Sequence, residues 1–362
     1  MALDHPGVPR RPAPRPWFIP SRRWAAGDAA AEEARRTRWT HLPSAAMAAP
    51  RMLDPREYDA DPPLLDAVHS AILLGQPLLV TGEPGCGKTE VANFIAFHLG
   101  LERPDVATGR PEYALRFDTK STTTARDLFY SFDTVGRFHA ARSDDPGADD
   151  PRRFITFNAL GRAVLDACPP DRVVGLSGRN WTAPEGGPRR SVVLIDEIDK
   201  APRDVPNDLL MEVERLAFYV PELDRHVQAD DALRPIVVLT SNSERVLPDA
   251  FLRRCVFHTM SFPDEDRLRR IVRRRMAGLP ADGPLLDDAV RLFLALREEG
   301  LRKPPGTAEL LGFLAALRDL GFDPDAGLSG QAGWQGAARA TMLKTVEDQR
   351  QFGDKALGDL AG

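Results

Sequence analysis

The sequence has few of the features that indicate a membrane, an oxidising compartment or a zinc site. Its 362 residues include three cysteines, Cys86, Cys168 and Cys255, which lie far apart and form no Cys-x-x-Cys pair. This pattern favours neither a disulfide framework nor a zinc site. No apolar run approaches the roughly 20 residues needed to cross a bilayer, and the N-terminus lacks the apolar core of a signal peptide. We therefore expect a cytoplasmic protein with reduced thiols and no membrane partner.

An excess of positive charge is also absent. Lys and Arg total 48 against 53 Asp and Glu, which gives a formal net charge of −5. Proteins that bind nucleic acid nonspecifically need a surplus of cations to neutralise phosphates. Such binding is therefore not expected, although a local basic groove is compatible with this charge. A hydrophobic content of 43% and a charged content of 28% are those of a globular chain.

Residues 1–52 differ in composition from the rest of the chain. Pro and Arg dominate the stretch HPGVPRRPAPRPWFIP (5–20), and no sustained hydrophobic period follows it. This pattern predicts a disordered N-terminal tail. Two other interpretations remain open. The tail is an arginine-rich tether for a partner or an anionic surface, or translation begins at Met47 or Met52.

Strands and helices alternate through residues 53–262. Short apolar runs bounded by polar residues predict strands at 76–82, 113–119, 191–197, 234–242 and 255–262. The first, third and fourth are apolar enough to be buried on both faces, as in a parallel sheet covered by helices. We predict a doubly wound α/β domain with a five-stranded parallel sheet.

The strand pattern ends at Pro263. Apolar residues at helical spacing, with Gly at the breaks, predict helices at 264–279, 284–300, 306–321 and 333–352. We predict a small all-helical domain at 263–352 and a C-terminal tail at 353–362.

The stretch TGEPGCGKTE (81–90) follows the first predicted strand and precedes an amphipathic helix. Its G-x-x-x-x-G-K-T spacing is that of a P-loop, in which glycines let the backbone wrap phosphates. Lys88 is expected to reach the β- and γ-phosphates, and the Thr89 hydroxyl to bind Mg²⁺. The strand–loop–helix context disfavours an incidental glycine turn. The predicted nucleotide-binding residues are Gly82, Glu83, Pro84, Gly85, Cys86, Gly87, Lys88, Thr89 and Glu90.

Polar side chains end the third and fourth predicted strands. Asp196 and Glu197 follow a buried run, at the strand end where open α/β sheets bind ligands. We predict that Asp196 binds Mg²⁺ and that Glu197 polarises the attacking water, although acidic residues also follow strands as helix caps. Asn242 is predicted to orient this water or to contact the γ-phosphate. Its alternative role is that of a turn residue.

Arg253 and Arg254 directly precede the fifth predicted strand. A cation from a neighbouring subunit stabilises the charge that develops on the γ-phosphate. We predict that at least one of the pair acts in trans as an arginine finger. The alternative is a solvated pair of surface arginines.

Four segments occur in the order that AAA+ ATPases use for Walker A, Walker B, sensor 1 and the arginine finger: 82–89, 192–199, 237–242 and 249–254. The chain therefore resembles this family and, within it, the MoxR-type branch, on softer cues at 127–133, 157–165 and 217–227. The resemblance implies a P-loop NTPase fold with a helical lid, and ATP with Mg²⁺ as ligands. It also implies a homo-oligomeric ring, usually a hexamer, with sites at subunit interfaces. The implied activity is chaperone-like remodelling of a protein partner, often with a von Willebrand factor A domain protein. Some members occur in bacterial conflict or defence modules.

One segment departs from the family pattern. The family usually places a sensor 2 arginine near the start of a lid helix, where this chain has Thr307 within RKPPGTAELLGF (302–313). Thr307 is predicted to be a helix N-cap. Arg302 and Lys303 are the candidates for the missing positive charge.

Two alternative functions remain. A nucleic-acid motor on the same fold, such as a translocating restriction subunit, is suggested by the arginines of RLRRIVRRRM (267–276). That segment has no interleaved aromatic residues for base stacking, and its arginines also suit a solvated or interface helix. The other alternative is a scaffold that binds ATP and hydrolyses it slowly.

Overall fold

The computed structural model describes residues 54–104, 111–143, 145–176, 178–276 and 282–361. The chain divides into two compact units, Leu53–Phe262 and a second unit that takes in Pro263–Gly362. The tail predicted at 1–52 lies outside the described residues. Within the described residues, no helix combines the length and the apolar character that crossing a bilayer requires.

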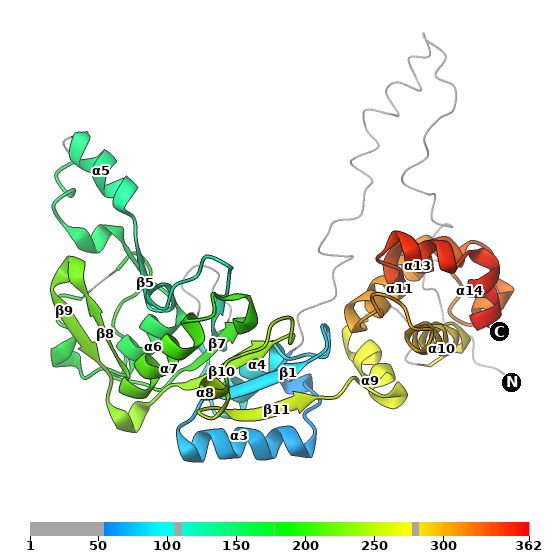
Figure 1. Ribbon diagram of the computed structural model, residues 1–362, viewed down its shortest axis with the longest axis horizontal. Helices are drawn as coiled ribbons and strands as arrows, with labels where there is room; N and C mark the ends of the chain where they lie inside the picture. The colour runs from blue at the N-terminus through cyan, green and yellow to red at the C-terminus, as the bar shows by residue number, and fades with distance from the viewer. Residues whose placement is uncertain (1–53, 105–110, 144, 177, 277–281, 362) are drawn as a thin grey trace, which may run out of the picture. The chain divides into compact units, whose positions relative to one another are not determined.

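The first unit is built on a five-stranded parallel sheet (Figure 1). Its strands, in chain order, are β1 (Leu78–Gly82), β4 (Leu115–Asp118), β7 (Val192–Asp196), β10 (Ile236–Ser241) and β11 (Val256–Met260). Their spatial order is β11-β1-β10-β7-β4. Every residue of β7 and β10 is buried, which confirms the prediction that apolar runs form central strands. The predicted parallel five-stranded fold is confirmed.

Alternate residues of the strands supply two hydrophobic cores, because successive side chains point to opposite faces of a sheet. Leu78, Val80 and Leu194 pack on one face with helices α3 (Pro62–Leu74) and α4 (Glu90–His98). Leu79 and Ile195 pack on the other face with α6 (Ala159–Asp166) and α7 (Val205–Arg215). Helices on both faces leave the carboxyl edge of the sheet open for a ligand.

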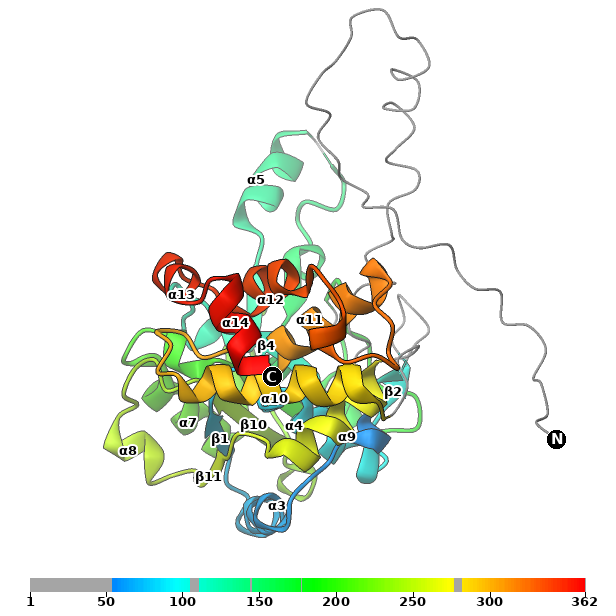
Figure 2. The ribbon, with the colours of Figure 1, turned by 90° about the vertical axis from the view of Figure 1, so that its right-hand side faces the viewer.

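Smaller elements extend the first unit. They comprise the helices α5 (Thr134–Arg142) and α8 (Asp249–Leu252) and the antiparallel pairs β2 (Arg103–Pro104) with β3 (Pro111–Glu112), β5 (Tyr130–Phe132) with β6 (Ile155–Phe157), and β8 (Ala217–Val220) with β9 (Arg225–Gln228). Residues 217–227, one of the cues for the MoxR-type branch, lie in the β8–β9 hairpin. Helix α5 has no buried residue and projects away from the sheet of its unit (Figures 1 and 2).

The second unit is helical over its described residues (Figure 2). Its helices are α9 (Glu265–Arg275), α10 (Pro284–Glu298), α11 (Thr307–Leu320), α12 (Trp334–Met342), α13 (Val346–Gln351) and α14 (Asp354–Ala361). Helix α10 contacts both α11 and α14, and α11 contacts α12. Phe293, Leu314 and Trp334 are buried in this unit. The predicted helical lid is confirmed as an all-helical region.

Two expectations for the second unit are wrong. The single helix predicted at 333–352 is two helices, α12 and α13, because the Thr345 side chain caps a new helix by accepting from the Asp348 N–H. The tail predicted at 353–362 contains α14, in which Leu357 is fully buried. Tertiary burial of this leucine against neighbouring helices stabilises a short segment whose own helix propensity is modest.

Two buried thiols predict a loss of stability at alkaline pH. Burial raises the pKa of Cys255 from 9.0 to about 12 and the pKa of Cys168 to about 11. Above pH ~9 the unfolded thiol ionises while the folded thiol stays protonated, so the unfolded state gains stability at about 1.4 kcal/mol per pH unit per thiol. The stability that the two protonated thiols contribute is therefore complete below pH ~9 and is lost towards pH ~12.

Urea unfolding of the parent and of Cys255→Ala between pH 8 and pH 10.5 tests this expectation. The free energy of unfolding should fall less steeply with pH in the variant, because the variant lacks the titrating thiol. Parallel pH slopes for the two proteins would contradict it.

Candidate functional site

The predicted P-loop joins β1 to α4. Gly82, Gly85 and Gly87 have φ angles of 144°, 81° and 95°, values that favour glycine because they lie in the left-handed region of backbone conformation. A Cβ on Gly82 would lie 2.7 Å from the Met260 carbonyl oxygen on β11. Glycine at this position thus allows both the turn and the close approach of the neighbouring strand. Glu83, Pro84 and Gly85 form the exposed part of the loop, whereas Cys86 is buried.

Lys88 and Thr89 occupy the end of the loop. The Lys88 ammonium is buried and donates at 2.8 Å to the carbonyl oxygens of both Gly82 and Glu83. Thr89 precedes α4 without capping it, and its hydroxyl instead donates to both Asp196 carboxylate oxygens at 3.3 Å. The structure therefore brings the P-loop threonine and the first Walker B carboxylate together. Glu90 begins α4 and accepts from the Asn93 side chain.

A hydrogen-bond relay connects the two central strands at their carboxyl ends. The Thr240 hydroxyl on β10 donates to Asp196 Oδ1 at 2.5 Å. The same hydroxyl oxygen accepts from the Glu197 backbone N–H at 2.9 Å. Asp196 is 7% exposed, so its charge depends on these donors for stabilisation. Thr240 thereby sets the relative positions of both acidic residues.

Glu197 is held at both carboxylate oxygens. Asn242 Nδ2 donates to Oε1 at 2.9 Å, and Lys200 Nζ contacts Oε2 at 2.5 Å. The pKa of Lys200 is raised, chiefly by this hydrogen bond. The structure therefore brings Asn242 to the carboxylate that was predicted to polarise the attacking water.

The backbone at this edge is strained. Glu197 and Ser243 have positive φ angles of 55° and 59°, and such conformations cost non-glycine residues about 1–3 kcal/mol each. Buried Asp199 supports this region, because its Oδ2 accepts from the Glu244 N–H at 2.9 Å and ties the segment after β7 to the loop after β10. Strained residues fixed by their surroundings are common at catalytic sites.

Arg253 and Arg254 are not brought to the P-loop of their own chain. Both side chains are exposed at the end of α8, and Arg254 Nε lies 3.7 Å from Glu214 Oε1. The following strand, β11, begins opposite Leu78, so the pair lies near the amino end of the sheet. The P-loop lies at the carboxyl end of β1. The arginine pair and the P-loop therefore lie at opposite ends of the sheet.

A model of the AAA domain (dynein-related subfamily) matches residues 77–275, which is more than half of the chain. The chain belongs to this AAA family. Its predicted P-loop lies within the matched residues. A search of curated protein sequences found no match.

Similar solved structures include NtrX from Brucella abortus in complex with ADP, at 14% identity and a TM-score of 0.43, covering 83% of this chain and 57% of that chain. The ATP complex of the same protein has a TM-score of 0.42 at 14% identity, with the same coverage. A point mutant of RuvB from Thermotoga maritima has 15% identity and a TM-score of 0.39, covering 83% of this chain and 70% of that chain. The AAA chain thus spans little more than half the length of the NtrX chain in these complexes.

The sensor 2 candidates lie in the helical unit of the AAA protein. The prediction that Thr307 is an N-cap is wrong, because Gly306 caps α11 and Thr307 is its first residue. Glu309 accepts from the Gly306 N–H at 3.1 Å, which satisfies the helix start without the Thr307 hydroxyl. The backbone N–H groups of Arg302 and Lys303 donate to Asp348 at 3.0 and 3.4 Å, while both side chains are exposed.

Three residues of the site were missed from the sequence: Thr240, Lys200 and Arg116, whose Nη2 lies 2.9 Å from Asp196 Oδ2. Thr240 lies within the segment 237–242, and Lys200 directly follows the segment 192–199. Their closeness in sequence to the predicted site residues could have indicated both. Arg116 lies on β4, far from both motifs in sequence, and only the pairing of β4 with β7 brings it to Asp196.

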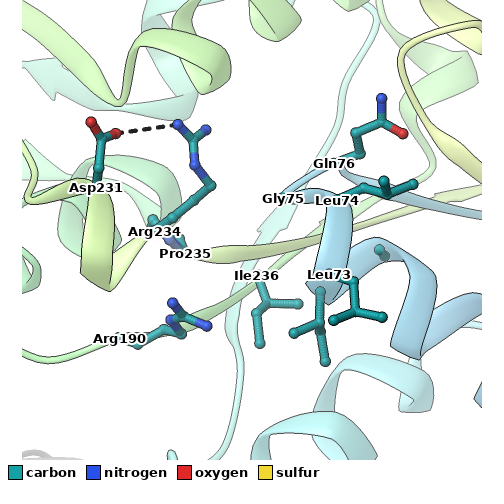
Figure 3. Close-up of a pocket in the computed structure, with 11 residues that line it drawn as sticks. Leu73, Leu74, Gly75, Gln76, Arg190, Asp231, Arg234, Pro235 and Ile236 are labelled. Atoms are coloured by element: carbon teal, nitrogen blue, oxygen red, sulfur yellow. Dashed lines mark hydrogen bonds and ion pairs between the residues drawn. The ribbon is translucent and has the colours of Figure 1, made fainter.

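Two pockets of the AAA domain differ in their relation to this site. One, of about 580 Å³, is lined by Asp199 and by other residues of 198–206 and 245–249. It lies beside the hydrogen bond from the Glu244 N–H to Asp199. The other, of about 270 Å³, lies between the end of α3 and the starts of β7 and β10 (Figure 3). There Arg234 pairs with Asp231 at 3.3 Å. This second pocket is at the amino ends of the strands and therefore does not belong to the nucleotide site.

Proposed function

We propose that this chain is a MoxR-like ATPase that hydrolyses ATP at the subunit interfaces of a ring to remodel or activate a protein partner. The observation that carries the proposal is the continuous set of hydrogen bonds from Thr89 through Asp196 and Thr240 to Glu197, which Asn242 completes. These contacts support the proposal, because they bring together, at one edge of the sheet, the residues to which it assigns metal binding, water activation and sensing. That combination suits hydrolysis rather than nucleotide binding alone.

Each residue has a distinct role in the proposed reaction. The backbone N–H groups of 82–89, except at Pro84, which has none, and the Lys88 ammonium bind the phosphates. Glu197 accepts a proton from the attacking water. Asn242 fixes the Glu197 carboxylate by donating to its Oε1. Closure of the helical unit, with a domain boundary at Pro263, would convert hydrolysis into movement.

The oxygen atoms near the P-loop suit Mg²⁺. The Thr89 hydroxyl and the Asp196 carboxylate are hard oxygen donors that already lie 3.3 Å apart. Among the described residues, no cluster of three or more His, Cys, Asp or Glu side chains is suited to a metal ion. Mg²⁺ usually takes one or two protein oxygens and completes its shell with phosphates and water. When bound, it would neutralise charge on the β- and γ-phosphates.

The proposed ring follows from the position of the arginines. Arg253 or Arg254 of one copy would reach the γ-phosphate held by the next, so that neither copy is complete alone. A hexamer, a von Willebrand factor A domain partner, a role in a defence module and a cytoplasmic location belong to this proposal through the MoxR resemblance.

Mixing two inactive variants tests the shared site. Lys88→Ala lacks the phosphate-binding ammonium, and Arg253→Ala/Arg254→Ala lacks the finger, so each alone should be inactive. In an equal mixture about a quarter of the interfaces would combine an intact P-loop with an intact finger, and ATPase activity should return to about that fraction. Absence of rescue at every mixing ratio, with both variants folded and assembled, would contradict a site shared between copies.

The nucleic-acid alternative receives less support from helix α9. Arg269 pairs with both Glu265 and Asp287, and Arg273 pairs with Asp282. Arginines neutralised within their own unit contribute little to phosphate binding. ATPase activity that rose steeply with added DNA, and fell steeply with salt, would favour this alternative.

A further inference from the structure

Arg116 forms an ion pair with the carboxylate that the proposed function assigns to Mg²⁺. Strand β4 lies beside β7 with Asp118 opposite Asp196, so the Arg116 side chain extends along the carboxyl edge of the sheet. Its Nη2 lies 2.9 Å from Asp196 Oδ2 and 2.7 Å from Asp118 Oδ1. One guanidinium therefore bridges two carboxylates of very different exposure, 9% for the Asp196 side chain and 64% for that of Asp118.

The two oxygens of Asp196 receive different donors. Oδ1 accepts from Thr240 and Oδ2 from Arg116, while Thr89 reaches both. A buried carboxylate is costly without a compensating charge, and Arg116 supplies that charge. A divalent cation approaching the same carboxylate would meet a positive guanidinium at close range, and like charges in a partly buried site repel strongly.

We propose that Arg116 is an internal counter-ion that competes with Mg²⁺ for Asp196 and withdraws to Asp118 when the metal binds. The inference rests on the proposed assignment of Asp196 to Mg²⁺. Withdrawal requires little rearrangement, because Arg116 is already bonded to Asp118 through Nε at 2.8 Å and its side chain is 52% exposed. Arg116 is thus a positioning residue: it orients the Asp196 carboxylate, and it sets the Mg²⁺ concentration at which the site is filled.

Opposite shifts are expected on changing Arg116 and on changing Asp118, its second carboxylate partner. Arg116→Gln removes the competing charge, so the Mg²⁺ midpoint should fall by about fivefold, as expected for a partly exposed ion pair. Arg116→Lys keeps the charge and should stay near the parent midpoint. Asp118→Asn removes the carboxylate to which Arg116 withdraws, so its midpoint should rise. Arg152→Gln is the control, because Arg152 is an exposed arginine paired with Asp150 at 2.7 Å.

The measurement is the binding of a fluorescent ATP analogue to the full chain, titrated with Mg²⁺ for each variant. An unchanged or raised midpoint for Arg116→Gln overturns the inference, as does a lowered midpoint for Asp118→Asn. Asp196→Asn separates this failure from failure of the metal assignment. Binding that is independent of Mg²⁺ in both the parent and Asp196→Asn would overturn the assignment and the inference together. A shifted Asp196→Asn midpoint beside an unshifted Arg116→Gln midpoint overturns the inference alone.

Discussion

Replacing Glu197 with Gln is expected to lower kcat for ATP hydrolysis by about 10²–10⁴, the range attributed to a positioned general base. The amide retains an oxygen that can accept from Asn242 Nδ2, which lies 2.9 Å from Glu197 Oε1 in the parent. It cannot take up a proton from water at neutral pH. Nucleotide binding should therefore persist while turnover is lost.

Steady-state turnover and equilibrium binding of an ATP analogue together check this expectation. Glu244→Gln is the matched control, because Glu244 is an exposed carboxylate on the loop after β10, and its substitution removes the same charge. The control should retain parental turnover. Equal, very slow turnover in the parent and in Glu197→Gln would instead favour the scaffold that binds ATP with little hydrolysis.

Replacing Gly161 with Ala is expected to cost at least 2–3 kcal/mol of folding free energy, at the upper end of the roughly 1–3 kcal/mol typical of overpacking. Gly161 lies in α6, and an added Cβ would be 2.0 Å from the Phe129 carbonyl oxygen. That carbonyl cannot move freely, because it accepts from the Asn158 N–H at 2.8 Å. Relief of the clash would displace α6, whose Leu160 and Val164 pack in the core beneath the sheet.

Gly312→Ala is the matched control for this substitution. Gly312 also lies in a helix, α11, but an added Cβ there would meet no atom within 4 Å. Since alanine is a better helix former than glycine, the control should gain up to about 1 kcal/mol. Urea unfolding would measure both effects, and hydrogen exchange of the α6 amides would measure the local effect of Gly161→Ala. Equal stability of the two variants would show that α6 has room for the methyl group.

The parts of the site that could be predicted are formed by residues that are close together in the sequence. The P-loop could be predicted because its strand, glycines, Lys88 and helix are contiguous, and Asp196 and Glu197 because they end a buried run. Arg116 could not, because its contact with Asp196 depends on β4 lying beside β7. The distance between the predicted arginine pair and the P-loop of the same chain likewise depends on the placement of β11 beside β1.

The wrong predictions for the helical unit have local physical causes. Gly306 and Thr307 are adjacent and both residue types start helices, but Glu309 is correctly spaced to bond the Gly306 N–H. Because of that spacing, the N-cap is Gly306, one residue before the predicted Thr307. Helix α14 was missed because its formation depends on burial of Leu357 rather than on a long amphipathic pattern.

The spatial order of the strands also constrains how the chain can fold. Strand β10 lies between β1 and β7, although both of those strands precede it in the sequence. A nascent chain that stops before Ile236 would have the P-loop strand and the acidic strand without the partner that joins them. Two apolar strand edges would then be exposed at once, which is a setting that promotes aggregation. Ribosome-bound fragments ending near residue 230 should therefore be protease-sensitive, and the sheet should become resistant only after residue 260 has left the exit tunnel.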